Sequence, residues 1–347
     1  MNPESAALLT VIVPTYNRAK FIGRLFAYAA EVKFPFRILI ADSSRDADRR
    51  ANEFRVEANR SILSVEYLHV DCGLMDKLLR GIERVQTPYC CLWADDDFQL
   101  PEGLLSCLKF LERSPDYGSC MGQFLAVRRK RPDWDLFLET YPSRDESAAA
   151  DRILRWSENF YSNFYAVYRT PVLRQMLQVA VEASCYERCR IIPEILIGQV
   201  GLLLGRQRMI DEVSIVYQMH PANDSRLTPC VRDHAAFPED YRRYRETLTR
   251  SVAENAGLTI AEADRVVDQS FRNVHPWTGG HGRWRIRLWE KLRRPWKRMR
   301  LKWDARRAVP RFSQVRKEPL MPEDPRLKPG NVSVALRWIE RHPAGVE

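Results

Sequence analysis

Hydrophobic and polar positions follow two different periods along the first 130 residues. Short apolar runs lie at residues 8–14, 36–41, 65–70 and 89–94. Three longer segments between them carry apolar residues at roughly helical spacing, at 20–31, 47–58 and 75–85. Strands that alternate with helices of this length are typical of a parallel sheet built by right-handed crossovers. The pattern therefore predicts an α/β fold in which helices flank a mostly parallel sheet.

The chain beyond this region is less regular. Pro101 begins a helical pattern that continues to about residue 111, and residues 117–127 form a further predicted strand. The polar segment 128–150 contains two prolines, so we expect a mobile loop there, followed by a second half at 151–223. The proline-rich segment 319–329 is predicted to be irregular.

Three of the predicted strands end in polar side chains. In an open α/β sheet, ligands bind outside the carboxyl ends of the strands. The side chains in question are Thr15, Tyr16 and Asn17, then Asp42, Ser43 and Ser44, then Asp95, Asp96 and Asp97. This edge of the sheet is therefore the predicted site.

The acidic run at Asp95, Asp96 and Asp97 indicates a metal. Three consecutive carboxylates repel one another unless a cation lies among them. Mg²⁺ and Mn²⁺ favour oxygen ligands, and Mg²⁺ usually takes one or two carboxylates together with phosphate oxygens of its substrate. The alternative is a solvated acidic turn that stabilises the helix beginning at Pro101.

These motifs resemble family 2 of the inverting glycosyltransferases, which have the GT-A fold. Residues 11–18 read Val-Ile-Val-Pro-Thr-Tyr-Asn-Arg, as the family's first strand often does, and the resemblance covers roughly residues 8–220. It implies a nucleotide-diphospho-sugar donor and Mg²⁺ or Mn²⁺ as the cofactor. The donor would be bound by Pro14, Thr15, Asn17, Arg18, Asp42, Asp95 and Asp96. The family's metal motif usually begins with an aspartate where this chain has Ala94.

Further residues are assigned roles around this core. Lys77 lies in the helix before the metal strand, where it either binds the diphosphate or is a solvated surface residue. The inverting reaction needs a base, and the resemblance suggests Glu194, with Glu187 and Asp211 as competitors. The alternative is that Glu194 only stabilises the first turn of a helix, where an acidic side chain is favourable. His220 is either a further metal ligand or a structural histidine.

The net charge of +10 is concentrated in one segment. Residues 283–307 contain twelve Lys or Arg against two acids, and Trp289, Trp296 and Trp303 recur every seven residues. An amphipathic helix of this composition suits a membrane surface. Packing against the enzyme's own core is the second hypothesis, and binding to nucleic acid is a distant third.

These inferences define a three-part enzyme. Residues 1–130 are the nucleotide-sugar-binding half of a GT-A domain, residues 131–225 the acceptor-side half, and residues 226–347 a basic helical C-terminal extension. The acceptor is expected to be a hydroxyl of a glycan or lipid-linked molecule in cell-surface polysaccharide synthesis. We expect a cytoplasmic location, peripheral at the inner face of the membrane, with reduced cysteines. The alternatives are a nucleotidyltransferase and a non-catalytic binding protein.

Overall fold

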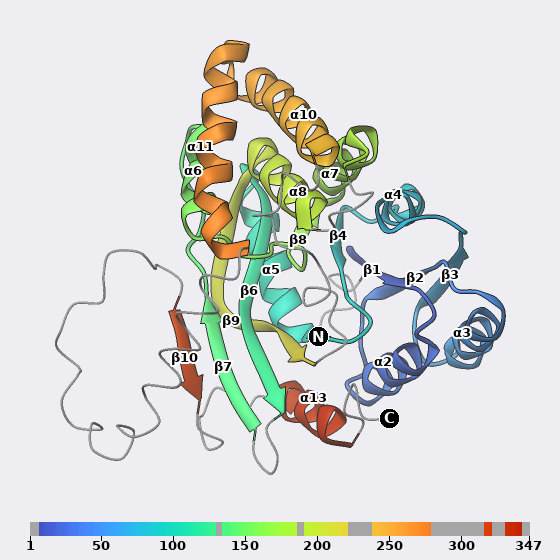
Figure 1. Ribbon diagram of the computed structural model, residues 1–347. Helices are drawn as coiled ribbons and strands as arrows, with labels where there is room; N and C mark the ends of the chain where they lie inside the picture. Colours follow the sequence, from blue (N-terminus) through green and yellow to red (C-terminus); the bar gives the residue numbers. More distant parts are fainter. Residues whose placement is uncertain are drawn as a thin grey trace, which may run out of the picture.

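A central sheet is covered by helices on both of its faces (Figure 1). The computed structural model describes residues 7–129, 134–185, 191–220, 238–278, 316–320 and 330–341. Its sheet has the strand order β10-β7-β6-β8-β4-β1-β2-β3, and β9 joins it by pairing with β6 and β5. The predicted α/β class is confirmed.

The first half contains the parallel part of the sheet. Neighbouring strands run parallel in the order β4-β1-β2-β3, with bounds β1 (Leu9–Thr15), β2 (Arg37–Asp42), β3 (Val65–His69) and β4 (Tyr89–Leu92). The connecting helices are α2 (Ala19–Glu31), α3 (Asp46–Asn59) and α4 (Leu74–Arg84). Each of these elements lies within two residues of its predicted range, because apolar periodicity is strongest in buried strands and crossover helices.

The second half adds antiparallel pairing and a layer of helices. Strand β8 pairs antiparallel with both β4 and β6, so it joins the two parts of the sheet. The elements are β5 (Phe98–Gln99), α5 (Pro101–Arg113), β6 (Tyr117–Arg129), β7 (Trp134–Thr140), α6 (Ala149–Glu158), β8 (Val167–Arg169), α7 (Thr170–Ala183), α8 (Ile191–Leu204), β9 (Arg206–Met219), α10 (Pro238–Ala256) and α11 (Ile260–Thr278).

The prediction of a loop over residues 128–150 is wrong in its first part. Strand β6 continues to Arg129, and β7 pairs with it in antiparallel fashion. In β7, Leu136 and Leu138 are buried, whereas Asp135, Phe137 and Glu139 are only partly buried. This alternation is the pattern of a half-buried strand, and the surrounding charges and prolines obscured it.

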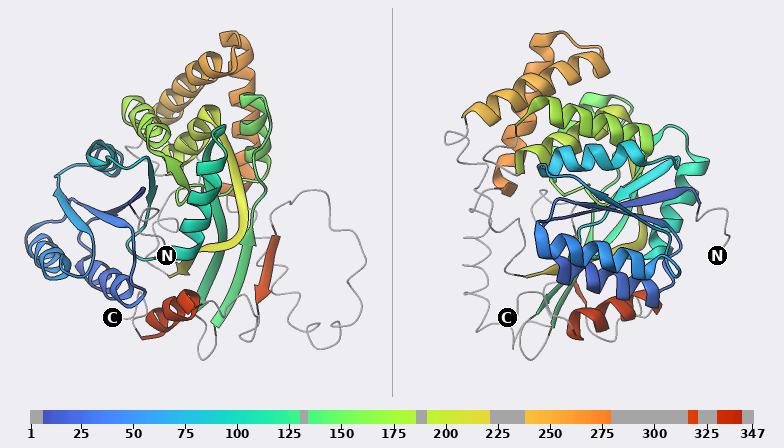
Figure 2. Two further views of the ribbon diagram at one scale, coloured as in Figure 1. Left: turned by 180° about the vertical axis from the view of Figure 1, so that it is seen from behind. Right: turned by 90° about the vertical axis from the view of Figure 1, so that its right-hand side faces the viewer.

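Two apolar cores form on opposite faces of the sheet because side chains alternate along each strand. Val11 and Val13 of β1 face a core shared with α2, α3 and α5, whereas Ile12 faces a core shared with α4, α7 and α8. Helices α10 and α11 extend the second core outward, stacked over α6 and α8 (Figures 1 and 2).

The chain's C-terminal part returns to the sheet. Strand β10 (Arg316–Leu320) pairs antiparallel with β7, and helix α13 (Gly330–Arg341) packs beside α2 (Figure 2). Arg337 forms an ion pair with Glu31 at 2.8 Å. The extension is therefore not purely helical, and Pro319, expected in an irregular segment, occupies an edge strand where a missing N–H is tolerated.

No helix among the described residues has the length and hydropathy needed to cross a membrane. Six cysteines within the described ranges are free thiols, and five of them are buried. Cys189 and Cys230 lie outside those ranges, as does the basic tryptophan segment at 283–307.

Candidate active site

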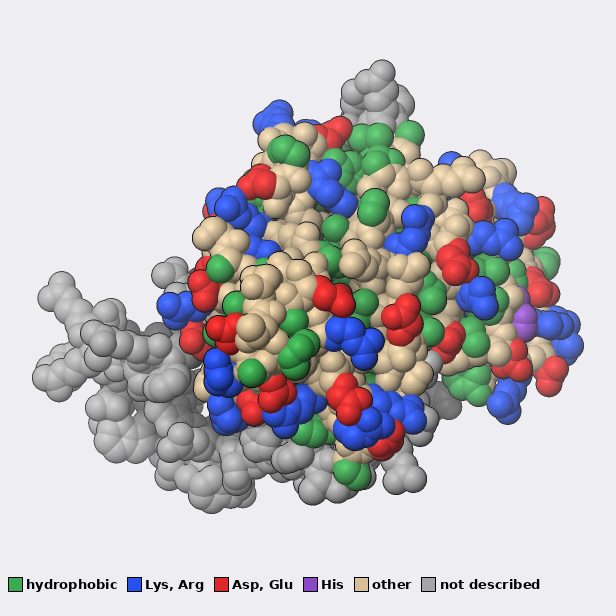
Figure 3. All heavy atoms as spheres, turned by 90° about the horizontal axis from the view of Figure 1, so that it is seen from above, with side chains coloured by type: hydrophobic (Ala, Val, Ile, Leu, Met, Phe, Trp, Pro, Cys, Tyr) green, Lys and Arg blue, Asp and Glu red, His purple; other side chains and the backbone are tan. Residues whose placement is uncertain are grey.

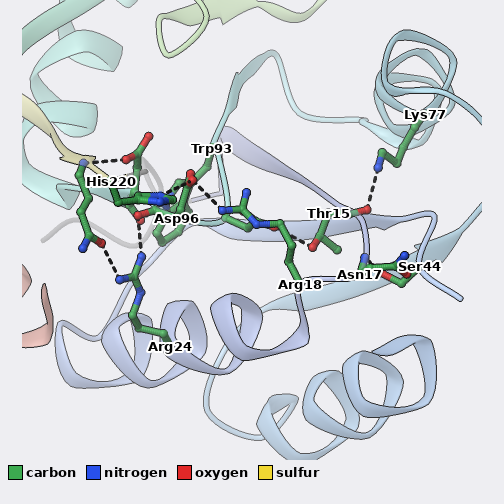
Figure 4. A network of polar contacts seen from close by, with 12 residues as sticks. Thr15, Asn17, Arg18, Arg24, Ser44, Lys77, Trp93, Asp96 and His220 are labelled. Carbon is green, nitrogen blue, oxygen red and sulfur yellow. Dashed lines mark hydrogen bonds and ion pairs between the residues drawn. The ribbon is translucent and has the colours of Figure 1, made fainter. Parts of the chain in front are cut away.

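The polar ends of β1, β2 and β4 meet at one edge of the sheet (Figure 4). Thr15 is paired in register with Asp42, and Ile12 with Leu92, which places the acidic run beside the end of β1. The site predicted from the strand ends is therefore assembled at this edge. Of its members, Pro14 lies within β1 opposite Ala41.

Asp42 lies in a closed cluster of neutral donors. Its Oδ1 accepts a hydrogen bond from the Ser44 amide at 2.6 Å, and its Oδ2 accepts from Asn52 at 2.9 Å and Tyr67 at 2.8 Å. The carboxylate is fully buried. This geometry orders the loop after β2, and the predicted contact with the nucleotide remains a prediction.

Asn17 and Lys77 tie the ends of β1 and β2 together. Asn17 has a φ of 52°, a left-handed conformation that asparagine tolerates better than most residues. Its amide donates to Ser44 Oγ at 2.7 Å. Lys77 is buried on α4 and donates to the Thr15 carbonyl at 2.7 Å and to Ser43 Oγ at 2.8 Å. Burial lowers the pKa of its ammonium. Lys77 is therefore not a solvated surface residue, which was the alternative to a role in binding the diphosphate.

Asp95 and Asp96 are held by cations and a hydroxyl. The guanidinium of Arg18 spans both, with Nη1 at 2.6 Å from Asp95 Oδ1 and Nη2 at 2.8 Å from Asp96 Oδ2. Thr15 Oγ1 donates to Asp95 Oδ2 at 2.7 Å. His220 Nε2 lies 2.9 Å from Asp96 Oδ2, so the end of β9 brings this histidine to the acidic run (Figure 4).

Asp97 differs from its two neighbours. Its Oδ1 accepts a hydrogen bond from the Gln218 amide at 2.9 Å, and its Oδ2 accepts from the Tyr165 hydroxyl at 2.5 Å. It is 2 % exposed. Both oxygens are therefore engaged in joining β9 and the segment before β8 to the acidic run. This arrangement suits a structural carboxylate better than a direct metal ligand.

The three carboxyl groups have different pKa values. Burial raises the pKa of Asp95 to about 7, although Arg18 opposes the shift. Burial also opposes ionisation of Asp96, but hydrogen bonds and charge from His220 and Arg18 outweigh it and lower the pKa to about 2. Burial and the charge of Asp96 hold the pKa of Asp97 well above its usual range. Asp96 is thus the most strongly ionised of the three.

The donor set fits a divalent cation shared with a substrate. Within the described residues, no three His, Cys, Asp or Glu side chains converge as a complete metal site. Asp96 and His220 nevertheless meet at one point, and Arg18 and His220 both contact Asp96 through Oδ2. An oxygen and an imidazole nitrogen are suitable ligands for Mn²⁺, and Mg²⁺ commonly completes its shell with phosphate oxygens and water.

Glu194 lies in the first turn of α8, close to the segment that bonds Asp97. It accepts a hydrogen bond from Ser162, and burial raises the pKa of its carboxyl group. Ser162 and Tyr165 belong to the same short connection between α6 and β8. One segment therefore contacts both Glu194 and the acidic run.

The two competitors for the base are placed differently. Asp211 is exposed on β9, nine residues before His220, which corresponds to about 30 Å along a strand. Glu187 lies outside the described residues.

Comparison with known proteins identifies the first half of the chain. Residues 10–177 match the family described as glycosyl transferase family 2. These residues form a family 2 glycosyltransferase domain. No curated protein sequence matches the chain.

Solved structures share the GT-A fold of this glycosyltransferase. Residues 1–349 of S. aureus TarS superpose with a TM-score of 0.56 at 18% identity, covering 79% of this chain and 73% of that one. TarS 1–349 in complex with UDP-GlcNAc gives 0.56 at 17% identity, covering 79% and 74%. The glycosyltransferase chain described here spans 43% of the longer TarS structure.

Sequence reasoning missed three residues that organise the glycosyltransferase site. Arg24 donates to the Asp96 carbonyl at 2.6 Å and to Gln218 Oε1 at 2.6 Å (Figure 4). Tyr165 and Gln218 hold Asp97. None of the three belongs to a local motif, because each reaches the acidic run from an element 68 or more positions away in the sequence.

Proposed function

We propose that this glycosyltransferase is metal-dependent and inverting. It moves a sugar from a nucleotide-diphospho-sugar to a hydroxyl of a glycan or lipid-linked acceptor, in cell-surface polysaccharide synthesis. The observation that carries the proposal is the contact of Asp96 with His220 at the carboxyl edge of the sheet, within a family 2 domain. A single displacement at the anomeric carbon inverts its configuration.

The chain's own residues supply binding and proton transfer. Asp96 and His220 would hold the cation, with Asp95 beside them, and the bound cation stabilises negative charge on the leaving diphosphate. Lys77 and Asn17 keep the loops after β1 and β2 in place for the nucleotide. Glu194 accepts the proton of the acceptor hydroxyl as its oxygen bonds to the anomeric carbon. The bond from that carbon to the diphosphate oxygen breaks, releasing a nucleoside diphosphate.

Product analysis tests this proposal. The enzyme is incubated with UDP-, GDP- and dTDP-sugars in the presence of Mn²⁺, with EDTA as the control, and released nucleotide is measured. UDP-GlcNAc is the first donor to try because TarS, which shares the fold, was solved with it. We expect a nucleoside diphosphate, and NMR of the product should show an inverted anomeric centre. Release of pyrophosphate would indicate a nucleotidyltransferase, and binding without turnover of any donor and acceptor would indicate a non-catalytic protein.

The basic segment supports a membrane-borne acceptor. Residues 283–307 carry a local excess of ten positive charges, equal to the net charge of the whole chain. By contrast, the face formed by α10 and α11 has Arg interspersed with Asp and Glu (Figure 3). Anionic lipid attracts such a segment, and tryptophan suits headgroup depth. Co-sedimentation with anionic vesicles at low salt, lost at high salt, is the expected result, and binding to neutral vesicles alone would contradict it.

A further inference from the structure

The guanidinium of Arg18 occupies the carboxylates that the proposed cation needs. It spans Asp95 and Asp96, and its contact with Asp96 is on Oδ2, the same oxygen that His220 approaches. Its side chain is 30% exposed. The guanidinium carbon also lies 4.2 Å from the centre of the Phe21 ring, which stacks on His220. Arg18 thus provides positive charge at the point where a metal would provide it.

Arg24 shows how a fixed arginine is built at the same site. It is 7% exposed, and it donates to the carbonyl of Asp96 and to the side chain of Gln218. Burial lowers its pKa to about 10. Releasing Arg24 would leave a buried charge and unsatisfied acceptors. Arg18 has solvent beside it and an aromatic face to rest on, so its release has a much smaller penalty.

We propose that Arg18 is a positioning residue that closes the metal site until the donor arrives. In the free enzyme it neutralises Asp95 and Asp96 and competes with a divalent cation for them. When the cation and the nucleotide diphosphate enter together, the guanidinium transfers to the diphosphate. This inference rests on the metal dependence proposed above and adds an order to it: the cation binds well only together with the nucleotide.

Electrostatics gives the reason for the exchange. A guanidinium and a divalent cation on the same two carboxylates repel each other, so the second to arrive must displace the first. The diphosphate offers the displaced guanidinium pairs of anionic oxygens, which the planar guanidinium binds through two parallel N–H groups. The cation and nucleotide are therefore coupled through Arg18, and the coupling is reciprocal.

Mn²⁺ binding without turnover tests the proposal. Electron paramagnetic resonance measures free Mn²⁺ against the wild-type enzyme, Arg18→Met and Arg18→Lys, with and without UDP. Without nucleotide, Arg18→Met should bind Mn²⁺ about tenfold more tightly than wild type, because the competing cation is gone. Arg18→Lys should lie between them, since its ammonium keeps the charge without the planar fork. Adding UDP should tighten Mn²⁺ binding in wild type much more than in Arg18→Met.

Arg50→Met is the matched control, because it removes one positive charge from an exposed position on α3. It should bind Mn²⁺ like wild type. Circular dichroism melting checks the fold of each variant, and if Arg18→Met does not fold, Arg18→Lys still decides the question.

The outcomes separate the two proposals. Equal or weaker Mn²⁺ binding by both Arg18 variants, with Mn²⁺ still required for turnover, overturns the role of Arg18 and leaves the metal dependence standing. Turnover that persists in EDTA, with no Mn²⁺ bound by any form even in the presence of UDP, overturns the metal dependence itself.

Discussion

Two carboxylate clusters lie at the same edge of the sheet, and their partners differ in kind. Asp42 accepts hydrogen bonds from a backbone amide, an amide side chain and a phenol. Asp95 and Asp96 share the guanidinium of Arg18, and Asp96 also contacts His220. Neutral donors hold the first cluster, whereas cationic or ionisable groups dominate the second.

The difference separates framework from chemistry. If a neutral donor moves away from a buried carboxylate, the carboxylate loses a hydrogen bond that nothing replaces. The Asp42 cluster therefore fixes the loop after β2. A cation that leaves can be replaced by another cation, so the pair Asp95 and Asp96 can exchange its partner during a reaction cycle. Substitutions in the first cluster should therefore reduce stability, and those in the second should reduce activity.

The largest effect is expected for Asp96→Asn. It removes the most strongly ionised carboxylate and, with it, the proposed metal ligand, so turnover should fall about 10³-fold, the size seen when a main electrostatic stabiliser is lost. The melting temperature should change little, because Asn still accepts from Arg18. Asp116→Asn, which alters an exposed ion pair with Arg206, is the control and should retain full turnover. Turnover within tenfold of wild type in Asp96→Asn would place the metal elsewhere.

Glu194→Gln should lower turnover about 10²-fold while leaving the affinity for the donor unchanged, because only proton acceptance is lost. Burial raises the pKa of Glu194, and the base is active only when ionised. Wild-type turnover should therefore fall as pH decreases through that raised pKa, and this limb should be absent from the variant's pH profile. If Glu187→Gln shows this behaviour and Glu194→Gln does not, the base is Glu187.

The same pKa shift predicts an effect on stability. When the pKa of a group is higher in the folded state than in the unfolded state, the group stabilises the fold. This contribution is fully present at pH values below the unfolded-state pKa, and it is lost as pH rises through the folded-state pKa. Wild type should therefore lose stability relative to Glu194→Gln as pH rises from about 4 to neutral. Melting curves across this range measure the difference. If the stability of the two proteins changed with pH in the same way, ionisation of Glu194 would not destabilise the fold. That result would weaken the assignment of Glu194 as the base.

The contrast between the clusters also marks what could be predicted from the sequence. The parallel strands and crossover helices were predicted closely, because their apolar periodicity is the direct signature of burial on one face. The placement of Asp42 and Asp96 at one edge followed from the topology of such a sheet, whereas the sequence left His220 as either a metal ligand or a structural histidine. Strand β7 was missed because its apolar residues Leu136, Phe137 and Leu138 are consecutive rather than alternating, and charges and prolines surround them.

The partners of each carboxylate could not be predicted. The sequence assigned Arg18 to the donor and Asp97 to the metal, but it did not indicate that Arg18 pairs with Asp95 and Asp96 or that Gln218 and Tyr165 donate to Asp97. Such pairings depend on which side chains from distant elements arrive at the same point. No local period or spacing encodes that information.

Asp42→Asn is expected to act on stability. An asparagine presents an NH₂ group where the carboxylate accepted from Ser44 or from Asn52 and Tyr67, so at least one buried donor is left unsatisfied, at a cost of about 2 kcal/mol in the free energy of unfolding. Urea titration measures this cost, and turnover assayed well below the melting temperature should be retained. Unchanged stability with lost donor affinity would instead show that Asp42 contacts the nucleotide, which would break the comparison.

The smallest effect comes from a matched pair of tyrosines, one in each part of the site. Tyr67 donates to Asp42 and Tyr165 donates to Asp97. Tyr67→Phe should lower the free energy of unfolding by about 1 kcal/mol with little change in turnover, because Asp42 keeps two other donors. Tyr165→Phe removes one of the two hydrogen bonds that Asp97 accepts from described residues and keeps the one from the Gln218 backbone amide. Since Asp97 adjoins Asp96, Tyr165→Phe should also weaken Mn²⁺ binding measured with UDP present. Equal loss of stability in both variants, with Mn²⁺ affinity unchanged in both, would mean that Asp97 belongs to the framework together with Asp42. The boundary between framework and chemistry would then lie between Asp96 and Asp97.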